Sequence, residues 1–327
     1  MTDAQTLEPV IDPDRIIVDP HHHLWPGEER AAYLLDELRG DTGSGHRVEA
    51  TVFIECLTGY RDNGPGHLRC IGETDFVRAV AQSSGDGDGA RISAIVGAAD
   101  LRDERVEDVL AAHIAAGAGL FRGIRHAAAW DPSDAIRVSH HRPPPRLYLD
   151  EEFRAGFAQL APLGLSFDAW LYHPQIPDLT NLARTFPETM IVLDHFGGPL
   201  GIGPYADRRA EVFADWRRNI APLAVCPNVF AKLGGMAMPI NGYGWHKEGG
   251  APSSEAFVAA QSDYYRAAID LFSPARCMFE SNFPVDKVSL SYRTLWNAFK
   301  RLAAPYNEAE KDQMFRGTAS RFYRLQA

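Results

Sequence analysis

The chain has 327 residues, of which 45% are hydrophobic and 23% are charged. This is the composition of an ordinary globular protein, and it excludes disorder as the main state. The formal net charge of −10, together with the lack of a dense Lys/Arg run, excludes an extended basic surface for nucleic acid. We therefore expect a small-molecule substrate, because a few convergent Arg and Lys side chains still bind an anion inside an acidic protein.

The cysteines and the N-terminal residues indicate the cellular compartment in which we expect the protein. The four cysteines have no CxxC spacing, and we expect buried free thiols at Cys56, Cys70, Cys226 and Cys277. The polar, acidic N-terminal stretch lacks the apolar core of a signal peptide, and no apolar run approaches membrane-spanning length. We predict a cytoplasmic protein that does not enter a membrane, and the sequence leaves a homo-oligomer open.

Short β-branched or apolar segments alternate with longer amphipathic stretches along the chain, which is the pattern of a parallel sheet wrapped by helices. We predict eight strands, at 16–19, 50–55, 92–99, 120–125, 165–171, 190–194, 228–234 and 276–281. Apolar residues recur at three- and four-residue spacing and predict helices that include 73–83, 104–117, 151–164, 209–224 and 254–272. The fold class is therefore α/β, a single (β/α)₈ TIM barrel over 16–327 after an N-terminal extension, 1–15.

Polar clusters follow most of the predicted strands: HHHLW, RHAAAW, YHPQ, HFGGP and NFPVDK. In a barrel these positions converge on the C-terminal face, where barrel enzymes hold their active sites. No GxGxxG follows the first strand, and no GxSxG is present. Two long connections, 126–149 and 235–253, lack regular periodicity, and we expect both to lie over the barrel mouth as lids or binding loops.

Histidines at strand ends are the first candidates for chemistry. His21 and His23 are two residues apart, so both imidazoles point to one side and can reach the same metal ion, whereas His22 points away. His195 follows the sixth strand, where it suits either a metal ligand or a general base. We predict a divalent metal, zinc or manganese, on His21, His23 and His195.

Cations and loop residues are the candidates for substrate binding. Arg125, His126 and Lys232 suit a substrate carboxylate or a developing oxyanion, while either Arg125 or Lys232 could instead pair with Glu55. Only one of Tyr172 and His173 is expected to face inward, because strand side chains alternate. From the second long loop we expect Trp245 and His246 to contact substrate. The predicted substrate-binding set is Glu55, Arg125, His126, Tyr172, His173, Lys232, Trp245 and His246.

The eighth strand ends in FESNFPVDK, which offers oxygen groups at Glu280, Asn282 and Asp286. A hydrolase needs a proton acceptor here for the attacking water, and the amide of Asn282 does not accept a proton at neutral pH. Asp286 can replace the missing base if the loop folds inward. We take His195, Asn282 and Asp286 as the catalytic candidates.

These segments together carry a family resemblance. VDPHHHLW, RGIRH, VLDHFGGP, NVFAKLGG, MFESNFPVDK and GTASRFYRL, in this order from Asp19 to Leu325, resemble the amidohydrolase-related branch of the amidohydrolase superfamily. That branch is similar to sugar-acid lactonases and 2-pyrone-4,6-dicarboxylate lactonase, and more distantly to aromatic and muconate-type decarboxylases. The resemblance implies a barrel, a metal-binding pair at His21 and His23, the sixth-strand histidine at His195 and a carboxylate contact at Arg125.

One departure from the family pattern affects the mechanism. Members place an aspartate in a GSDWP-like segment where this sequence has Asn282, and some lactonases of the branch work without a tightly held metal. We therefore expect a hydrolase of a lactone or a related carboxylated ring, with water activated by the histidines with or without a metal. Two alternatives stay open, a non-oxidative decarboxylase and a barrel that has lost catalysis and serves as a binding protein.

Overall fold

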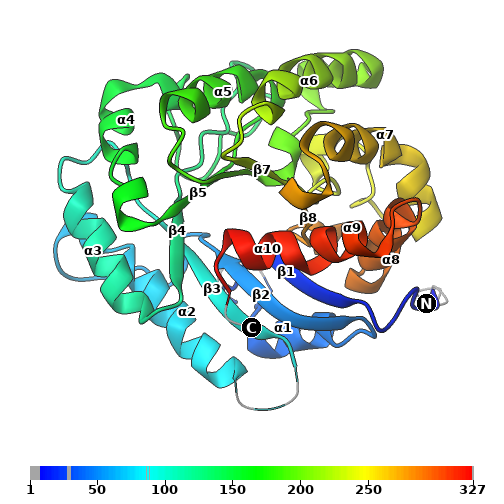
Figure 1. The fold of residues 1–327 in the computed structure, drawn as a ribbon, viewed down its shortest axis with the longest axis horizontal. Helices are drawn as coiled ribbons and strands as arrows, with labels where there is room; N and C mark the ends of the chain where they lie inside the picture. Colours follow the sequence, from blue (N-terminus) through cyan, green and yellow to red (C-terminus); the bar gives the residue numbers. More distant parts are fainter. Residues whose placement is uncertain (1–7, 28–30, 86, 88, 326–327) are drawn as a thin grey trace.

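The computed structural model describes residues 8–27, 31–85, 87 and 89–325. Eight parallel strands pair in chain order, each with the next, and helices surround them (Figure 1). The strands are β1 Ile16–His22, β2 Arg47–Ile54, β3 Arg91–Ala98, β4 Phe121–Arg125, β5 Ser166–Ala169, β6 Ile191–Leu193, β7 Val229–Leu233 and β8 Cys277–Phe279. The predicted TIM-barrel fold is confirmed, and each predicted strand overlaps an observed one.

The barrel closes between β1 and the segment after β8. His22 and Phe283 form a parallel bridge, the His23 amide donates to the Phe283 carbonyl at 2.8 Å, and the Asn282 amide donates to the His21 carbonyl at 3.0 Å. This closure places the histidine segment of β1 directly beside the eighth-strand segment, so residues about 260 positions apart in the sequence share one site.

The helices form the outer layer, and their apolar faces pack on the barrel. In α8, for example, Leu295, Trp296, Phe299 and Leu302 are buried at helical spacing, and the Ser291 side chain caps the first turn. The α-helices are α1 Leu35–Thr42, α2 Ile71–Ser84, α3 Val106–Gly117, α4 Glu151–Phe157, α5 Ile176–Thr185, α6 Arg209–Ala224, α7 Ser254–Phe272, α8 Tyr292–Ala303, α9 Glu308–Asp312 and α10 Thr318–Phe322.

One predicted helix is shorter than expected. The pattern over 151–164 predicts one continuous helix, but α4 ends at Phe157 and a separate 3₁₀ turn follows at Ala161–Leu163. Pro162 cannot donate a helical hydrogen bond, and Gly164 has φ of 65°, so the second half of the segment cannot continue the helix.

The last helix packs against the barrel interior, and Figure 1 shows it in red across the strands. Ala319, Phe322 and Tyr323 form one apolar cluster with strand residues such as Val18 and Val52, which precede the polar ends of β1 and β2. The C-terminal segment therefore closes the end of the barrel opposite the polar strand ends. Part of the N-terminal extension is also packed, because the Ile11 amide donates to Asn297 Oδ1 at 2.9 Å.

No helix among the described residues is long and apolar enough to cross a membrane. The cysteines are free thiols, of which Cys70, Cys226 and Cys277 are buried and Cys56 is partly exposed.

Candidate active site

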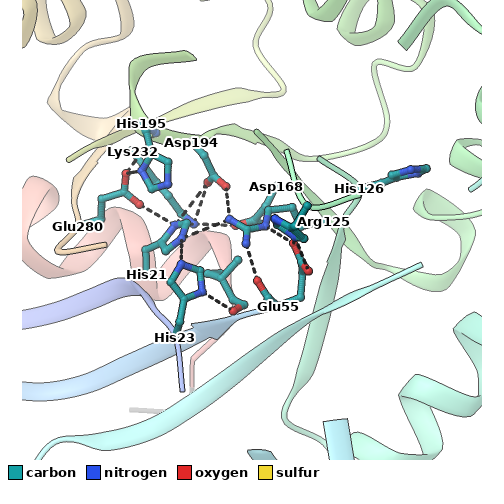
Figure 2. A network of polar contacts seen from close by, with 12 residues as sticks. His21, His23, Glu55, Arg125, His126, Asp168, Asp194, His195, Lys232 and Glu280 are labelled. Atoms are coloured by element: carbon teal, nitrogen blue, oxygen red, sulfur yellow. Dashed lines mark hydrogen bonds and ion pairs between the residues drawn. The ribbon is translucent and has the colours of Figure 1, made fainter. Parts of the chain in front are cut away.

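The first-strand histidines lie where the polar strand ends converge (Figure 2). His21 Nε2 and His23 Nε2 are 3.3 Å apart, and His23 Nδ1 lies 2.8 Å from the Ile54 carbonyl. Because a carbonyl can only accept, this bond leaves the proton on Nδ1 and the lone pair of His23 on Nε2. His22 lies on the other side, against the ring of Phe53. The alternation therefore turns two of the three histidines into the site.

His195 and Glu280 form a close polar pair in the site. His195 Nδ1 lies 2.6 Å from Glu280 Oε1, and the His195 amide also donates to Oε1 at 3.2 Å. Glu280 Oε2 lies 2.8 Å from His21 Nδ1, yet it accepts no hydrogen bond from any described residue. The residue directly after β8, Glu280, thus supplies the site carboxylate at this strand end, two residues before Asn282.

The local backbone allows this close approach. His195 has φ of 52°, a left-handed conformation that is strained for a residue with a side chain. Gly235, two residues after the end of β7, has φ of 65°, and a Cβ there would lie 2.2 Å from His195 Nδ1. A Cβ on Gly234 would similarly lie 2.4 Å from Glu280 Cγ. The two glycines of the AKLGG segment therefore make room for His195 and Glu280.

Lys232 is the buried cation at the centre of the network. Its Nζ lies 2.7 Å from Asp168 Oδ2, 3.0 Å from Asp194 Oδ1 and 3.1 Å from His21 Nδ1. Burial disfavours the ammonium, but Asp168 and Asp194 outweigh this and raise the pKa of Lys232. For Asp168, burial disfavours the ionised carboxylate and raises its pKa to about 6, although the Lys232 ammonium opposes this rise. Lys232 is fully buried and saturated with partners, so it positions His21 rather than facing bound substrate.

Arg125 and Glu55 form a second ion pair on the other side of His21. Arg125 Nε donates to Glu55 Oε1 at 2.7 Å, so the predicted alternative in which Arg125 pairs with Glu55 is the arrangement observed. The remaining guanidinium nitrogen Nη1 lies 3.4 Å from His21 Nε2 and 3.5 Å from Asp194 Oδ2. Burial disfavours ionised Glu55, but His140 and Arg125 hold its pKa well below the ordinary value.

Two histidines that the sequence did not single out complete this pair. His140 Nε2 lies 2.9 Å from Glu55 Oε1, and His141 Nε2 lies 3.1 Å from Glu55 Oε2. Both belong to the long connection 126–149, which therefore reaches the site as expected. The HH dipeptide was a visible signal, but it lies 15 residues beyond the end of β4, so spacing alone did not connect it to a strand end.

Asn282 and Asp286 pair with each other. Asn282 Nδ2 donates to Asp286 Oδ1 at 3.0 Å, and the Ala237 amide donates to Asp286 Oδ2 at 3.0 Å. The loop after β8 does fold inward, and burial raises the pKa of Asp286 to about 7. Both Asp286 oxygens are thus engaged in holding Asn282 and the segment after β7.

The other predicted substrate-binding residues lie in different surroundings. His126 is buried near Asp100 and Phe153 and points away from the cluster in Figure 2. His173 packs on Tyr205, and Tyr172 donates its hydroxyl to the Arg137 carbonyl. The remaining two are in the second long connection, where Trp245 packs between Tyr243 and Phe257 and His246 is exposed.

An apolar cluster beside His195 joins the two long connections. The Trp170 ring lies 4.9 Å from the His195 ring. Trp170 belongs to a cluster with Ile136 of the first long connection and Met238 of the second. This cluster supplies a dry wall next to the His195–Glu280 pair, which strengthens electrostatic interactions there.

The donor set fits a divalent cation. Donor atoms of His21, His195 and Glu280 lie within 4.8 Å of one another, and all three side chains are buried. The 3.3 Å between His21 Nε2 and His23 Nε2 equals the separation expected for two nitrogens at ~2.0–2.1 Å from one tetrahedral zinc. The buried Glu280 Oε2 without a hydrogen-bond donor is the kind of atom that a cation satisfies.

Comparison with known proteins places this site in a family. The "Amidohydrolase" family model matches residues 18–325. The chain is 32% identical to the uncharacterized protein y4mH of Sinorhizobium fredii, over 95% of this chain and 99% of that protein. It is 31% identical to an L-fucono-1,5-lactonase of Burkholderia multivorans, over 94% of this chain and 96% of that enzyme.

The solved structures agree with the sequence relatives. An amidohydrolase of Burkholderia multivorans crystallised with HEPES superposes with a TM-score of 0.75 at 27% identity, covering 95% of this chain and 100% of that one. In a second crystal form, which contains zinc, the TM-score is 0.74 at 24% identity, with the same coverage of both chains. The predicted family is confirmed, and the chain belongs to the amidohydrolase family.

Proposed function

We propose that the protein hydrolyses a lactone, opening the ring to the hydroxy acid. The observation that carries this proposal is the buried His195–Glu280 pair, held at 2.6 Å beside two further histidines and a cationic side chain. The L-fucono-1,5-lactonase similar to this chain over 94% of its length supports the substrate class. The proposed substrate is thus a cyclic ester.

The His195–Glu280 pair is the proton acceptor for the attacking water. Glu280 Oε1 orients the imidazole through Nδ1, which leaves Nε2 of His195 to accept the proton, and the carboxylate stabilises the imidazolium that forms. Water adds to the lactone carbonyl as it loses this proton. The ring carbon–oxygen bond then breaks, and the departing oxygen takes the proton back to become the hydroxyl of the product.

Arg125 stabilises the charge that develops on the carbonyl oxygen. Its Nη1 faces His21, and Glu55 holds the other edge of the guanidinium, so the donor is fixed before substrate binds. Lys232 acts one layer deeper, where it holds His21 and Asp194 in place.

A divalent cation, zinc or manganese, would be held by His21, His195 and Glu280, whose donor atoms lie within 4.8 Å of one another. His195 would bind it through Nε2, the nitrogen that does not face Glu280, so His195 serves as the proton acceptor when no cation is bound. When bound, the cation would polarise the lactone carbonyl and lower the pKa of water. Asn282 offers an amide where the family places a carboxylate, so the charge of the eighth strand at this site comes from Glu280.

A substrate panel tests the proposal. Purified protein, both metal-loaded and chelator-treated, is assayed against 1,4- and 1,5-lactones, simple esters, amides and carboxylated phenols. We expect turnover of lactones, with one ¹⁸O atom from labelled water in the carboxylate of the product. No turnover of any lactone, or release of carbon dioxide from the phenols instead, would contradict the proposal, and the second result would favour the decarboxylase alternative.

A further inference from the structure

A turn in the long connection after β4 directs two consecutive histidines at one buried carboxylate. The Arg142 amide donates to the Ser139 carbonyl at 2.9 Å and closes the turn. His140 and His141 occupy its two central positions, and their rings lie 4.4 Å apart. Each Nε2 contacts Glu55, which is fully buried directly after β2. The turn and the barrel strand thus bring three donor groups together.

The donor atoms of Glu55, His140 and His141 are spaced like the ligands of one metal ion. One donor atom of each residue lies within 4.8 Å of the other two. His140 Nε2 is 2.9 Å from Glu55 Oε1 and 3.1 Å from Oε2, and His141 Nε2 is 3.1 Å from Oε2. Adjacent ligands at ~2.1 Å from an octahedral ion are ~3.0 Å apart, which matches this spacing. A single N–H is directed at one acceptor, whereas His140 Nε2 is nearly equidistant from both oxygens.

The two imidazoles form the side of the cluster that faces solvent. The side chains of His140 and His141 are 28% and 14% exposed, whereas Glu55 is fully buried. Structural zinc sites are closed by four protein ligands, while sites with three protein ligands keep positions open for water or other small ligands. Two imidazoles and one carboxylate suit zinc and its neighbouring transition metals, and calcium and magnesium prefer oxygen ligands alone. The cluster therefore suits an exchangeable transition-metal ion.

Arg125 borders this cluster and the first-strand histidines alike. Its Nε lies 2.7 Å from Glu55 Oε1, and its Nη1 lies 3.4 Å from His21 Nε2, so its charge opposes a cation at either place. Asp194 Oδ2, at 3.5 Å from Nη1, offsets part of this charge. The buried network labelled in Figure 2 holds four acidic side chains against two basic ones: Glu55, Asp168, Asp194 and Glu280 against Arg125 and Lys232. Since Arg125 bonds to Oε1, the oxygen left for an ion is Oε2.

We propose that Glu55, His140 and His141 bind a divalent transition-metal ion, and that this ion clamps the connection 126–149 onto the barrel. Two of the ligands belong to the connection and the third to a strand end, so the ion joins a loop to the barrel wall. Because the ion needs all three ligands in place, its binding stabilises the docked connection. None of the three belongs to the metal-binding set of the candidate active site, and the inference does not depend on the proposed lactonase activity.

The zinc content of the full-length protein tests the site without an activity assay. Wild type and variants are stripped with a chelator, reloaded with zinc, passed through gel filtration and analysed for zinc per chain. We expect His140→Ala/His141→Ala and His140→Gln/His141→Gln each to hold one zinc fewer than the wild type. Glutamine keeps an N–H donor for Glu55 but is a poor metal ligand. The glutamine variant therefore separates metal binding from hydrogen bonding and from a folding defect.

Amide hydrogen exchange tests the clamp. In the wild type, zinc should slow exchange in peptides from 132–146 at least about fivefold, because the docked connection opens less often. The glutamine variant should exchange at the same rate with and without zinc. His246→Ala, which removes an exposed histidine of the other long connection, is the matched control and should behave like the wild type in both measurements.

Two results would overturn the inference. Equal zinc content in the wild type and the glutamine variant would remove the site and leave the two histidines as hydrogen-bond donors to Glu55. Exchange in the connection that does not respond to zinc would remove the clamp. Failure of the lactone panel, by contrast, contradicts the proposed activity and leaves the difference in zinc content unaffected.

Discussion

The hydroxyl of Tyr323 donates to Asp168 Oδ2 at 2.6 Å, and this bond connects the C-terminal segment to the centre of the barrel. Asp168 contacts Lys232, which in turn contacts His21. Every member of this chain is fully buried. The segment GTASRFYRL thus closes one end of the barrel and also holds the residues behind the site.

Loss of the tyrosine hydroxyl should loosen Lys232 and His21 without changing the substrate pocket. We expect Tyr323→Phe to lower kcat about tenfold, to change KM less than twofold, and to reduce the free energy of unfolding by about 1.5–3 kcal/mol, as for a hydrogen bond to a charged group. Steady-state kinetics measure kcat and KM, and denaturant unfolding measures the free energy of unfolding. Tyr306→Phe, at a half-buried tyrosine in the loop after α8, is the control, and an equal loss in both variants would contradict this role.

Removal of the buried Lys232 ammonium alone should lower the free energy of unfolding more than removal of Lys232 together with the charge of Asp168. Lys232→Met leaves Asp168 and Asp194 without their shared cation, and we expect about 3–5 kcal/mol of destabilisation. Lys232→Met/Asp168→Asn removes one of the stranded charges and should recover part of the loss. A double-mutant cycle measures this coupling, and strictly additive effects would argue against a direct Lys232–Asp168 interaction.

The strands and the first site histidines could be predicted because their signals are local. The HHH tract follows an apolar run, and His195 follows another, so strand alternation and barrel topology were enough to bring them together. His140 and the partners of Lys232 could not be predicted in this way, because their roles depend on a turn geometry and on contacts across the barrel. Glu280 was visible as an oxygen group at the end of the eighth strand, but its contact with His195 joins two strand ends and is not set by local spacing.

The close approach at Gly235 predicts a sharp steric effect. In Gly235→Ala the new methyl group would collide with His195 Nδ1, at 2.2 Å, and we expect kcat to fall at least 100-fold. Gly244→Ala is the matched control, because Gly244 also has positive φ, at 73°, but its nearest contact for a Cβ is a flexible lysine carbon at 3.9 Å. Similar activity losses in both variants would mean that backbone strain, and not displacement of His195, is responsible.

Asp286 should make stability fall as pH rises. Its pKa in the folded protein, about 7, lies above the ordinary value of 3.8, so the folded state binds this proton more tightly than the unfolded state. The resulting stabilisation is complete below about pH 4 and is lost as pH rises through 7, with a slope of up to ~1.4 kcal/mol per pH unit.

Asp286→Asn removes this titration and keeps the shape of the side chain. The difference in unfolding free energy between wild type and variant, measured in denaturant from pH 4 to 8, should therefore shift in favour of the variant as pH rises. A difference that is constant with pH would show that Asp286 titrates equally in the folded and unfolded states.

The carboxylate of Glu280 is central to the proposed mechanism, because it orients His195 and provides the charge that Asn282 lacks. The most direct measurement is kcat for the best lactone substrate in Glu280→Gln, which keeps the size of the side chain but removes its charge. We predict a fall in kcat of at least ~10³-fold, as expected when a general-base pair is lost, with KM and melting temperature close to wild type. A variant that keeps more than a third of the wild-type kcat would contradict the proposed role of the His195–Glu280 pair.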